Sequence, residues 1–255
     1  MEDNRFLAGK TALVTGASRN LGAVIAERLA HHGAAVAVNY HSSAETALEL
    51  VERLKSETGR EHAAIQADVR RAAEVRGLVE TAAEALGGRL DVLVNNAGPF
   101  SMTPYSELPE SDWDHIWDTN VMAAYLASQC VAPGMKSAGW GRIVNISAAS
   151  YVLRNHSIYG LAKDALIFLT EELAVELGPE VTVNAVAPGQ IIESAADIAE
   201  FDPTFVDRAI EATPAGRLVT RREVADIVAA LCSPAFAVVT GATIPVDGGF
   251  RLRCF

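Results

Sequence analysis

The chain has 255 residues, of which 50% are hydrophobic and 21% charged, and its formal net charge is −11. That length and composition suffice to bury one sizeable core, and the acidic balance argues against binding to a nucleic-acid backbone or to an anionic membrane surface. No stretch approaches the roughly 20 apolar residues that span a bilayer, and the N-terminus has no apolar run of signal-peptide length. The cysteines Cys130, Cys232 and Cys254 are widely spaced, so we expect reduced thiols, no metal site and a cytoplasmic location.

Short apolar runs alternate with longer amphipathic segments along the chain. The short runs are rich in Val, Ile and Ala, which is typical of strands covered on both faces of a parallel sheet. They predict strands at 11–15, 34–40, 62–69, 90–98, 142–147, 181–189 and 242–247. The segments between them predict helices at 20–33, 43–59, 72–88, 111–136, 157–177 and 220–233. Several of these end in glycine, as helices often do, and Ser111 with Asp114 resembles a capping box at the fourth.

This alternation predicts an α/β fold, namely a single doubly wound Rossmann domain over residues 1–255. The segment at about 190–217 breaks the pattern, because it follows a strand and carries Pro203 and Pro214 around an acidic, partly helical stretch. An insertion after the carboxyl end of such a strand lies over the ligand edge of the sheet. We therefore expect a substrate-facing lid here.

The turn after the first predicted strand, "TGASRNLG", predicts a loop that binds the phosphates of a dinucleotide. Gly16 permits the tight turn, Gly22 permits close packing of helix on strand, and the helix N-terminus offers free N–H groups to a pyrophosphate. The middle position is normally glycine, and Asn20 stands there instead. Asn tolerates left-handed backbone angles, so we expect the turn to survive, although a glycine pair at a helix start also occurs for packing alone. The expected contacts are Gly16, Ser18, Arg19, Asn20, Leu21 and Gly22.

The residues at the end of the second predicted strand indicate whether the cofactor is NAD or NADP. An Asp or Glu there would accept hydrogen bonds from the ribose 2′-hydroxyl of NAD, but "VNYHSS" has no carboxylate. Arg19 lies in the preceding loop, within reach of the same place, so the pattern favours a 2′-phosphate and NADP(H). The alternative is an ordinary polar loop with Ser42 or Ser43 as a helix N-cap. The contacts expected on this strand end are Asn39, Tyr40, His41 and Ser42.

The segment "SIYGLAKDAL" places Tyr159 and Lys163 four residues apart on a predicted helix, and so on one face. A Tyr hydroxyl is ordinarily a poor acid, with a pKa of about 10. A neighbouring ammonium lowers that pKa and makes Tyr a usable proton donor and acceptor. Most such pairs are nevertheless surface pairs.

Together these motifs resemble the short-chain dehydrogenases/reductases over nearly the whole chain. The resemblance rests on "TGASRNLG", "NNAG" at 95–98, "YGLAK", "APG" at 187–189 with Ile191, and "VDGG". It implies a seven-stranded parallel sheet, a homotetramer or dimer, and NADP(H)-dependent reduction of a small-molecule carbonyl of the ketone or oxoacyl type. The cofactor contacts it adds are Asn95, Ala97, Gly98, Pro188, Gly189 and Ile191.

The resemblance also implies the roles of single residues. Tyr159 is then the acid/base, Lys163 lowers the pKa of Tyr159 and holds the nicotinamide ribose, and Asn120 supports a proton-relay water. Asp68 and Val69 would contact adenine. Each has an alternative: Asp68 is also a candidate helix cap, Asn95 a structural strand-end residue, and Asn120 a polar kink in a buried helix.

One position departs from the family pattern. The Ser that hydrogen-bonds the substrate carbonyl is normally the second of "GRIVNISS", and here that position is Ala148. Ser150 has the correct strand parity, whereas Ser147 lies on the opposite face of a regular strand. We slightly prefer Ser147, because a bulge at the strand end would re-aim its side chain.

The departures leave two alternatives to a carbonyl reductase. Pteridine reductases of this family also replace the middle loop glycine, have a strand end similar to "NYHSS", and carry an aromatic where Phe100 stands. That aromatic would sandwich a flat pterin, although Phe100 is equally well explained as a packing residue. The second alternative is a nucleotide-binding protein with impaired catalysis, which Ala148 suggests.

Overall fold

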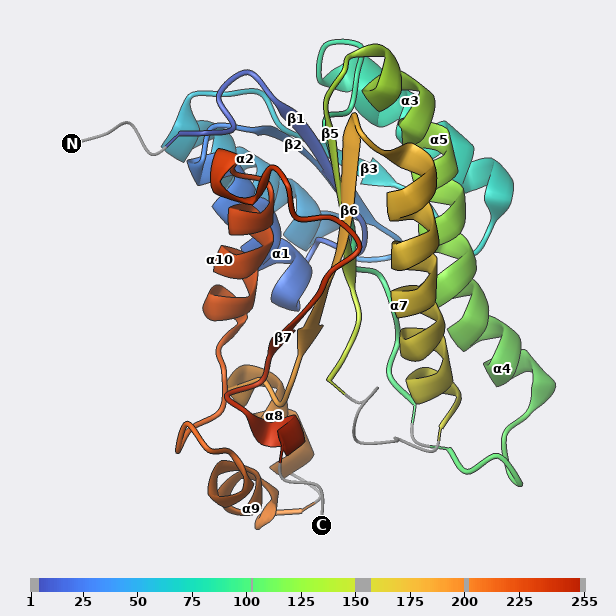
Figure 1. Ribbon diagram of the computed structural model, residues 1–255, viewed down its shortest axis with the longest axis vertical. Coiled ribbons are helices and arrows are strands. Elements are labelled where there is room, and N and C mark those ends of the chain that lie inside the picture. Colours follow the sequence, from blue (N-terminus) through green and yellow to red (C-terminus); the bar gives the residue numbers. More distant parts are fainter. Residues whose placement is uncertain (1–4, 102, 150–156, 200–201, 253–255) are drawn as a thin grey trace.

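The computed structural model describes residues 5–101, 103–149, 157–199 and 202–252. Its centre is a seven-stranded parallel sheet in the order β3-β2-β1-β4-β5-β6-β7, which confirms the predicted fold class (Figure 1). The strand order reverses between β1 and β4, and ligands bind such sheets at the carboxyl edge beside this switch point. The strands are β1 (Thr11–Val14), β2 (Ala35–Tyr40), β3 (Ala63–Gln66), β4 (Val92–Asn95), β5 (Gly141–Ile146), β6 (Val181–Pro188) and β7 (Thr243–Val246).

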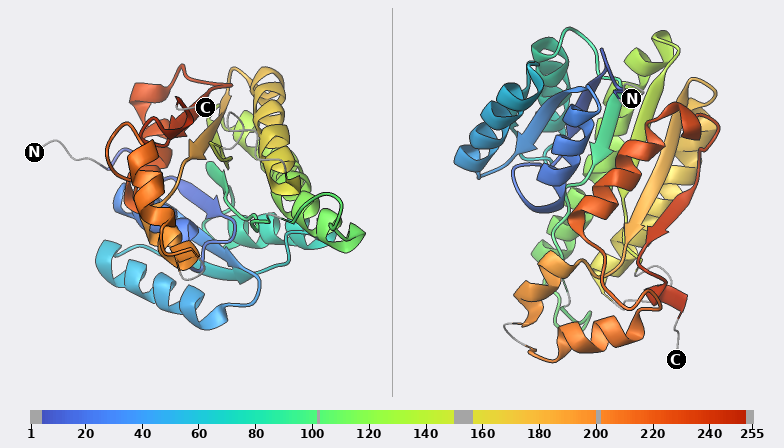
Figure 2. Two further views of the ribbon diagram at one scale, coloured as in Figure 1. Left: turned by 90° about the horizontal axis from the view of Figure 1, so that it is seen from below. Right: turned by 90° about the vertical axis from the view of Figure 1, so that its left-hand side faces the viewer.

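Helices cover both faces of the sheet (Figures 1 and 2). One layer consists of α1 (Asn20–His31), α2 (Ala44–Thr58) and α10 (Arg221–Leu231), and the opposite layer of α3 (Ala72–Ala85), α5 (Ala123–Ser137) and α7 (Ile158–Leu177). Successive strand residues point to opposite faces, so Val14 packs with the first layer and Leu13 with the second. Burial on both faces explains why the strands read as continuous apolar runs.

The predicted helix at 111–136 is interrupted. The structure has α4 (Glu110–Trp117), a π-helical turn (Asp118–Met122), and then α5. The capping box expected at Ser111 and Asp114 is wrong, because α4 starts one residue earlier behind Pro109, with no side-chain cap. π-Turns are rare and frequently occur at functional sites, and this one contains Asn120.

Two further helices, α8 (Ile192–Ala199) and α9 (Phe205–Ala212), occupy the segment expected to be a lid. They follow the carboxyl end of β6 and lie beyond the sheet, at the bottom of Figure 1. Ala195, Ala209 and Leu218 form a small apolar cluster of their own there. The chain then returns through η2 (Pro234–Phe236), β7 and η3 (Phe250–Leu252). None of the described helices is both long enough and apolar enough to cross a membrane.

His62, just before β3, gives the fold a dependence on pH. Its Nδ1 accepts a hydrogen bond from the Val36 N–H at 3.1 Å, its Nε2 lies 2.9 Å from Thr58 Oγ1, and burial lowers the pKa of His62 to about 4. The unfolded chain takes up this proton near pH 6.5 and the folded chain only near pH 4. Stability is therefore full above about pH 6.5 and falls as the pH drops toward 4, by up to about 3 kcal/mol.

Urea denaturation at a series of pH values measures this loss. His62→Gln should flatten the dependence of the unfolding free energy between pH 7 and pH 4. Identical slopes in the two proteins would show that His62 titrates normally in the folded state.

Candidate functional site

The glycine loop after β1 has the geometry that a phosphate site needs. Gly16 has φ +60°, and Asn20 has φ +53°, the one positive value at a non-glycine residue in the described part of the chain. The left-handed conformation predicted for Asn20 is therefore confirmed. A Cβ on Gly22 would lie 2.5 Å from the Gly16 oxygen and 2.6 Å from Asn96 Nδ2, so no side chain fits there.

Asn96 and Thr15 hold this loop in place, and neither was among the predicted site residues. Asn96 Nδ2 donates to the Thr15 carbonyl at 2.9 Å and to the Gly16 carbonyl at 3.1 Å. Thr15 Oγ1 in turn accepts from the backbone N–H groups of Asn96 and Ala97. The second Asn of "NNAG" was the available signal, because it follows β4, which lies beside β1.

The side chain of Asn39 also stabilises the glycine loop and does not face the ligand site at the end of β2. Its Oδ1 accepts from the Gly16 N–H at 3.1 Å, and its Nδ2 contacts the carbonyls of Ile65 and Ala67 at 3.3 Å. With 2% of its surface exposed, Asn39 has no free donor for a 2′-phosphate. That expectation is corrected, because burial commits its amide to neighbouring backbone.

Other predicted cofactor contacts around β2 remain accessible. Arg19 and His41 are exposed, as is Ser42, whereas Ser18, Leu21 and Tyr40 are partly buried. Ser43 occupies the N-cap position of α2, but its side chain makes no cap hydrogen bond. Arg19 is thus the exposed cation nearest in sequence to the glycine loop.

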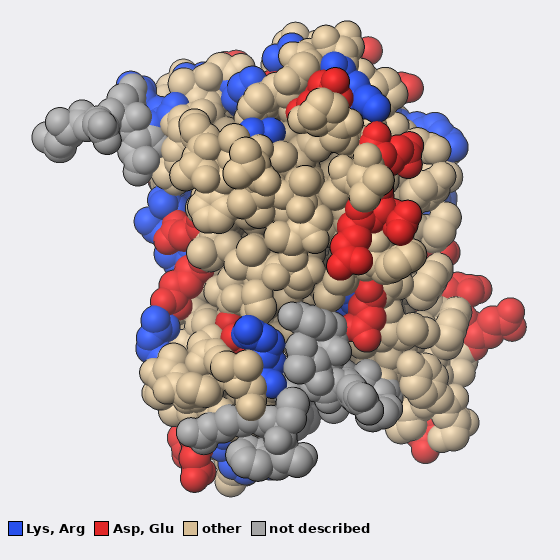
Figure 3. Space-filling view, viewed as in Figure 1, with Lys and Arg blue, Asp and Glu red and all other residues tan. Residues whose placement is uncertain are grey.

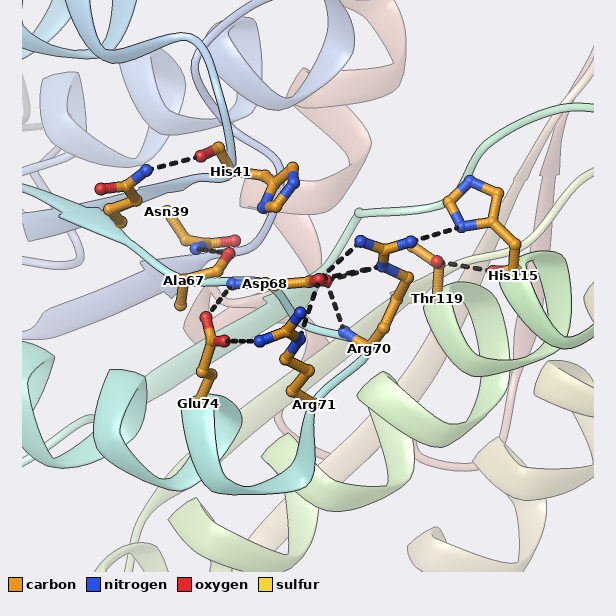
Figure 4. A network of polar contacts seen from close by, with 10 residues as sticks. Asn39, His41, Ala67, Asp68, Arg70, Arg71, Glu74, His115 and Thr119 are labelled. Carbon is orange, nitrogen blue, oxygen red and sulfur yellow. Dashed lines mark hydrogen bonds and ion pairs between the residues drawn. The ribbon is translucent and has the colours of Figure 1, made fainter. Parts of the chain in front are cut away.

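Asp68, after β3, lies in a network of charged residues (Figure 4). Its carboxylate accepts from Arg70 Nη2 at 2.6 Å and from Arg70 Nε at 2.8 and 3.1 Å, and these bonds lower the pKa of Asp68 to about 2. The Asp68 N–H donates to Glu74 Oε2 at 2.7 Å. The helix-cap alternative for Asp68 is wrong, because α3 has Arg71 at its N-cap with no side-chain cap.

Val69 is 8% exposed and packs in the core against α3. Its side chain is therefore a core residue, which leaves only its backbone to face a ligand. Adenine contact by Asp68 and Val69 stays a prediction.

The side chains of Lys163 and Asn120 meet at Gly98, and the ring of Tyr159 lies beside Lys163. Lys163 Nζ donates to the Ile146 carbonyl at 2.7 Å and lies 5.5 Å from the centroid of the Tyr159 ring. A Cβ on Gly98 would lie 2.2 Å from Asn120 Oδ1 and 3.1 Å from Lys163 Nζ. Only glycine fits between these polar groups, which brings α7, the π-turn and the end of β4 together.

Within the described residues, the side-chain amide of Asn120 is hydrogen-bonded through its nitrogen but not through its oxygen. Its Nδ2 donates to the Ile116 carbonyl at 2.9 Å, inside the turn that becomes π-helical. Its Oδ1 is buried and has no hydrogen-bond partner among the described residues. Buried acceptors are seldom left unpaired, so this oxygen marks a position for a ligand or water. The polar-kink alternative accounts only for the Nδ2 group, which bonds to the helix backbone.

Burial controls both ionisable groups of the pair. It raises the pKa of Tyr159 to about 12 and lowers the pKa of Lys163 to about 7. The lowered pKa predicted for Tyr159 is therefore wrong for this arrangement, because burial disfavours the charged phenolate. Tyr159 holds its proton at neutral pH and is poised to donate it.

The preference for Ser147 as substitute for the missing Ser is corrected. Backbone bonds from Ser147 N to Val186 O and from Ala149 N to Pro188 O continue the pairing with β6, so no bulge re-aims the side chain. Ser147 Oγ instead donates to the Lys163 carbonyl at 2.8 Å and is 2% exposed. Ser150, the other candidate, lies outside the described residues.

Phe100 stands at the site and faces solvent. Its ring centroid is 5.0 Å from that of Tyr159 in an edge-on arrangement, and 57% of its surface is exposed. A ring that served packing alone would be more deeply buried. This placement favours the substrate-contact interpretation of Phe100.

The remaining predicted contacts lie at the ends of β4 and β6. Asn95 is a structural residue: its Nδ2 donates to Asn145 Oδ1 at 2.8 Å, and it is 5% exposed. A Cβ on Gly189 would lie 2.6 Å from the Cβ of Asp247, so this glycine allows β6 and β7 to approach. Pro188 ends β6, Ile191 forms a bridge to Val219, and Ala97 is partly buried beside the glycine loop.

These features fit a dinucleotide. Gly16, Asn20 and Gly22 leave backbone accessible at the N-terminus of α1, where a pyrophosphate is favoured. Asn120 Oδ1 and Lys163 Nζ lie at Gly98, and the residue before it, Ala97, lies against Gly16 of the loop. The residues present can therefore hold a nicotinamide cofactor with a substrate beside Tyr159.

Comparison with known proteins agrees with this arrangement. A family model described as enoyl-(acyl carrier protein) reductase matches residues 16–251. The 3-oxoacyl-[acyl-carrier-protein] reductase of Staphylococcus epidermidis is 37% identical over 95% of this chain and 99% of its own. A short-chain dehydrogenase/reductase from Serratia marcescens superposes with a TM-score of 0.88 at 38% identity, covering 96% and 99% of the two chains. A blue fluorescent protein from a metagenomic library, in complex with NADPH, gives 0.85 at 38% identity, with the same coverage.

Proposed function

The chain belongs to the short-chain dehydrogenase/reductase family, and from that premise we propose that it reduces a small ketone or oxoacyl-type carbonyl with NADP(H). The observation that carries the proposal is that Lys163 and Asn120 meet at Gly98, with the ring of Tyr159 lying between Lys163 and the exposed Phe100. Residues 1–255 would act as one cofactor-binding unit, with the segment at about 190–217 as its substrate lid.

NADPH, when bound, supplies a hydride to the carbonyl carbon. Tyr159 donates its hydroxyl proton to the carbonyl oxygen, and a pKa near 12 keeps that proton on the phenol at neutral pH. Lys163, whose pKa near 7 leaves it partly protonated at neutral pH, binds the nicotinamide ribose and stabilises the phenolate that forms. Asn120 Oδ1 holds the water through which the proton is replaced.

The missing hydroxyl at Ala148 lowers the expected rate without removing the proton donor. One lost donor to a developing oxyanion costs on the order of 10²–10³ in rate in other enzymes. Tyr159 still reaches the same oxygen, which weighs against the impaired nucleotide-binding alternative. Ser150 remains a proposed substitute.

Turnover tests the proposal directly. We expect the purified protein to oxidise NADPH with at least one member of a panel of ketones, oxoacyl thioesters and quinones, measured by NADPH absorbance. Tight NADPH binding without turnover on any of them would favour the impaired alternative.

A pteridine-type reductase is the second candidate, and the ring of Phe100 favours it. An exposed aromatic beside the catalytic Tyr offers a flat apolar surface on which a pterin can stack. NADPH oxidation with dihydrobiopterin or dihydrofolate would support this candidate, and its absence would remove it.

Selectivity for NADP(H) is expected to depend on Arg19. It is exposed at the N-cap of α1, and no carboxylate follows it in the loop or at the end of β2. A charged hydrogen bond to a 2′-phosphate is worth about 1.5–3 kcal/mol, so Arg19→Ala should weaken NADPH binding by about 10- to 100-fold. Binding of NADH, which lacks the phosphate, should hardly change.

Fluorescence titration of both cofactors measures the selectivity, and Arg76→Ala is the matched control, because Arg76 is an exposed arginine on α3. Equal losses for NADPH and NADH in Arg19→Ala would contradict recognition of the 2′-phosphate by Arg19.

Charge and apolar surface suggest the partners. The exposed ionisable side chains of α7 are all acidic, and Figure 3 shows acidic groups on this side of the molecule. An acidic surface of this kind repels nucleic acid and anionic lipid.

The same helix exposes Leu161, Phe168 and Val175 at seven-residue intervals, by 42%, 64% and 85%. These exposed apolar side chains share one face of the helix, which supports a homotetramer or dimer of this chain. Cys130 and Cys232, the two cysteines that the structure describes, are free thiols, which supports the cytoplasm as its location.

A further inference from the structure

Two polar side chains of β5 and its extension face α7. Ile143, Asn145 and Ser147 alternate along the strand, and Ile143 belongs to the core on the α7 side of the sheet. Regular pairing with β6 continues through Ala149. Asn145 and Ser147 are consequently buried against α7, with 0% and 2% of their surfaces exposed.

The first of these contacts holds Lys163 at both its ends. Ser147 Oγ donates to the Lys163 carbonyl at 2.8 Å, and Lys163 Nζ donates to the Ile146 carbonyl at 2.7 Å. The end of β5 therefore grips the backbone and the ammonium of the same residue. Any sliding of α7 along the sheet breaks both bonds.

The second contact lies two helical turns further along α7. Asn145 Nδ2 donates to Thr170 Oγ1 at 2.9 Å, and the Thr170 hydroxyl donates to the Leu166 carbonyl at 2.7 Å. Thr170 is fully buried and lies on the same helix face as Lys163. Without its hydroxyl, the buried Asn145 amide would lose its partner, which is costly inside a protein.

The same network reaches α5, which follows directly on the π-helical turn that carries Asn120. Asn95 Nδ2 donates to Asn145 Oδ1 at 2.8 Å and lies 3.3 Å from Ser128 Oγ of α5. Ser128 is fully buried, two turns beyond the π-turn. Helix α7, which carries Tyr159 and Lys163, and helix α5, which follows the turn of Asn120, are thus bonded to one pair of asparagines in the centre of the sheet.

Apolar packing alone does not specify this alignment. The other buried side chains along α7 are aliphatic or small, and their attraction to the sheet has little directional preference. Hydrogen bonds are directional, and two of them separated along the helix define both its rotation and its translation.

We propose that Ser147 and the Asn145–Thr170 pair are positioning residues that set the register of α7 on the sheet, and with it the placement of Tyr159 and Lys163. The inference rests on the proposed function for its catalytic consequence. A displacement of about 1 Å far from the reacting atoms can cost about 100-fold in rate, so loss of this register should appear mainly in kcat.

Thr170→Val and Thr170→Ser test the inference as a matched pair. Valine keeps the volume and removes the hydroxyl, whereas serine keeps the hydroxyl. We expect Thr170→Val to lower kcat by about 10- to 100-fold with KM little changed, and Thr170→Ser to restore most of the rate. Rates are normalised to the fraction that binds NADPH. Leu173→Ala, which removes apolar packing from the same helix, should lower stability without a comparable loss of kcat.

Hydrogen exchange supplies a readout that does not need turnover. Amides at 158–163 should exchange at least about tenfold faster in Thr170→Val than in Thr170→Ser, because register is lost along the helix. Ser147→Ala should show the same faster exchange even if Thr170→Val fails to fold. Wild-type exchange at 158–163 in the folded hydroxyl-deletion variants would overturn the inference. Absence of turnover in the unmodified protein, with the exchange pattern intact, would overturn only the proposed function.

Discussion

Tyr159→Phe is expected to lower kcat for NADPH-dependent carbonyl reduction by about 10²–10⁴, the usual contribution of a positioned proton donor. The change removes only the hydroxyl, and the ring keeps its edge-on contact with Phe100. NADPH binding should change little, since the glycine loop and Arg19 are untouched. Steady-state kinetics together with cofactor titration measure the two effects separately.

Tyr125→Phe is the matched control, because Tyr125 is 38% exposed on α5 and its hydroxyl contacts only the neighbouring Gln129 among the described residues. It should leave kcat within about twofold, as surface changes away from special features usually do. Full activity of Tyr159→Phe would eliminate Tyr159 as the proton donor and transfer that role to another hydroxyl, such as Ser150.

Gly22→Ala is expected to damage both the cofactor site and the fold. The new Cβ would lie 2.5 Å from the Gly16 oxygen, 2.6 Å from Asn96 Nδ2 and 2.8 Å from the Ala17 Cα. Overpacking of this kind typically costs about 1–3 kcal/mol, which lowers the melting temperature of a chain of this size by roughly 2–12 °C. The displaced loop should also bind NADPH about 100-fold more weakly, equivalent to about 2.7 kcal/mol.

Gly77→Ala is a control with the opposite expected sign. Gly77 is also a helical glycine, but no described atom outside its own stretch of helix backbone lies within 4 Å of a Cβ built there. Alanine is the better helix former, so this variant should gain about 0.5–1 kcal/mol and bind NADPH normally. Thermal denaturation and cofactor titration of both variants complete the comparison. A stable Gly22→Ala protein with normal NADPH affinity would show that the loop does not hold the cofactor.

Features that depend on local pattern were predictable from the sequence. All seven strands and the helices of both layers follow from apolar periodicity, because the period of a strand or helix is a property of consecutive residues. The left-handed Asn20 and the shared face of Tyr159 and Lys163 are local in the same sense. The π-turn was missed, since apolar periodicity does not distinguish one wider turn from its α-helical neighbours.

Side-chain direction and partners depended on the tertiary structure. Whether Ser147 faced the substrate or α7 was decided by continued pairing with β6, whose residues lie about 40 positions later. Asn39 and Asn95 are both polar residues at strand ends, and burial between neighbouring strands turned them into structural residues. The role of Asn96 in holding the glycine loop followed only from the position of β4 beside β1.

The sequence by itself determined the fold, the family and the pair Tyr159–Lys163, because these depend on spacing within short segments. The tertiary structure decided which polar groups remain available for chemistry, because a group that is hydrogen-bonded to a distant segment cannot bind a ligand. Within the described part of the chain, it left Asn120 Oδ1 without a partner and bonded Ser147 Oγ to the Lys163 carbonyl. Burial, which no local pattern specifies, likewise raised the pKa of Tyr159 and lowered that of Lys163.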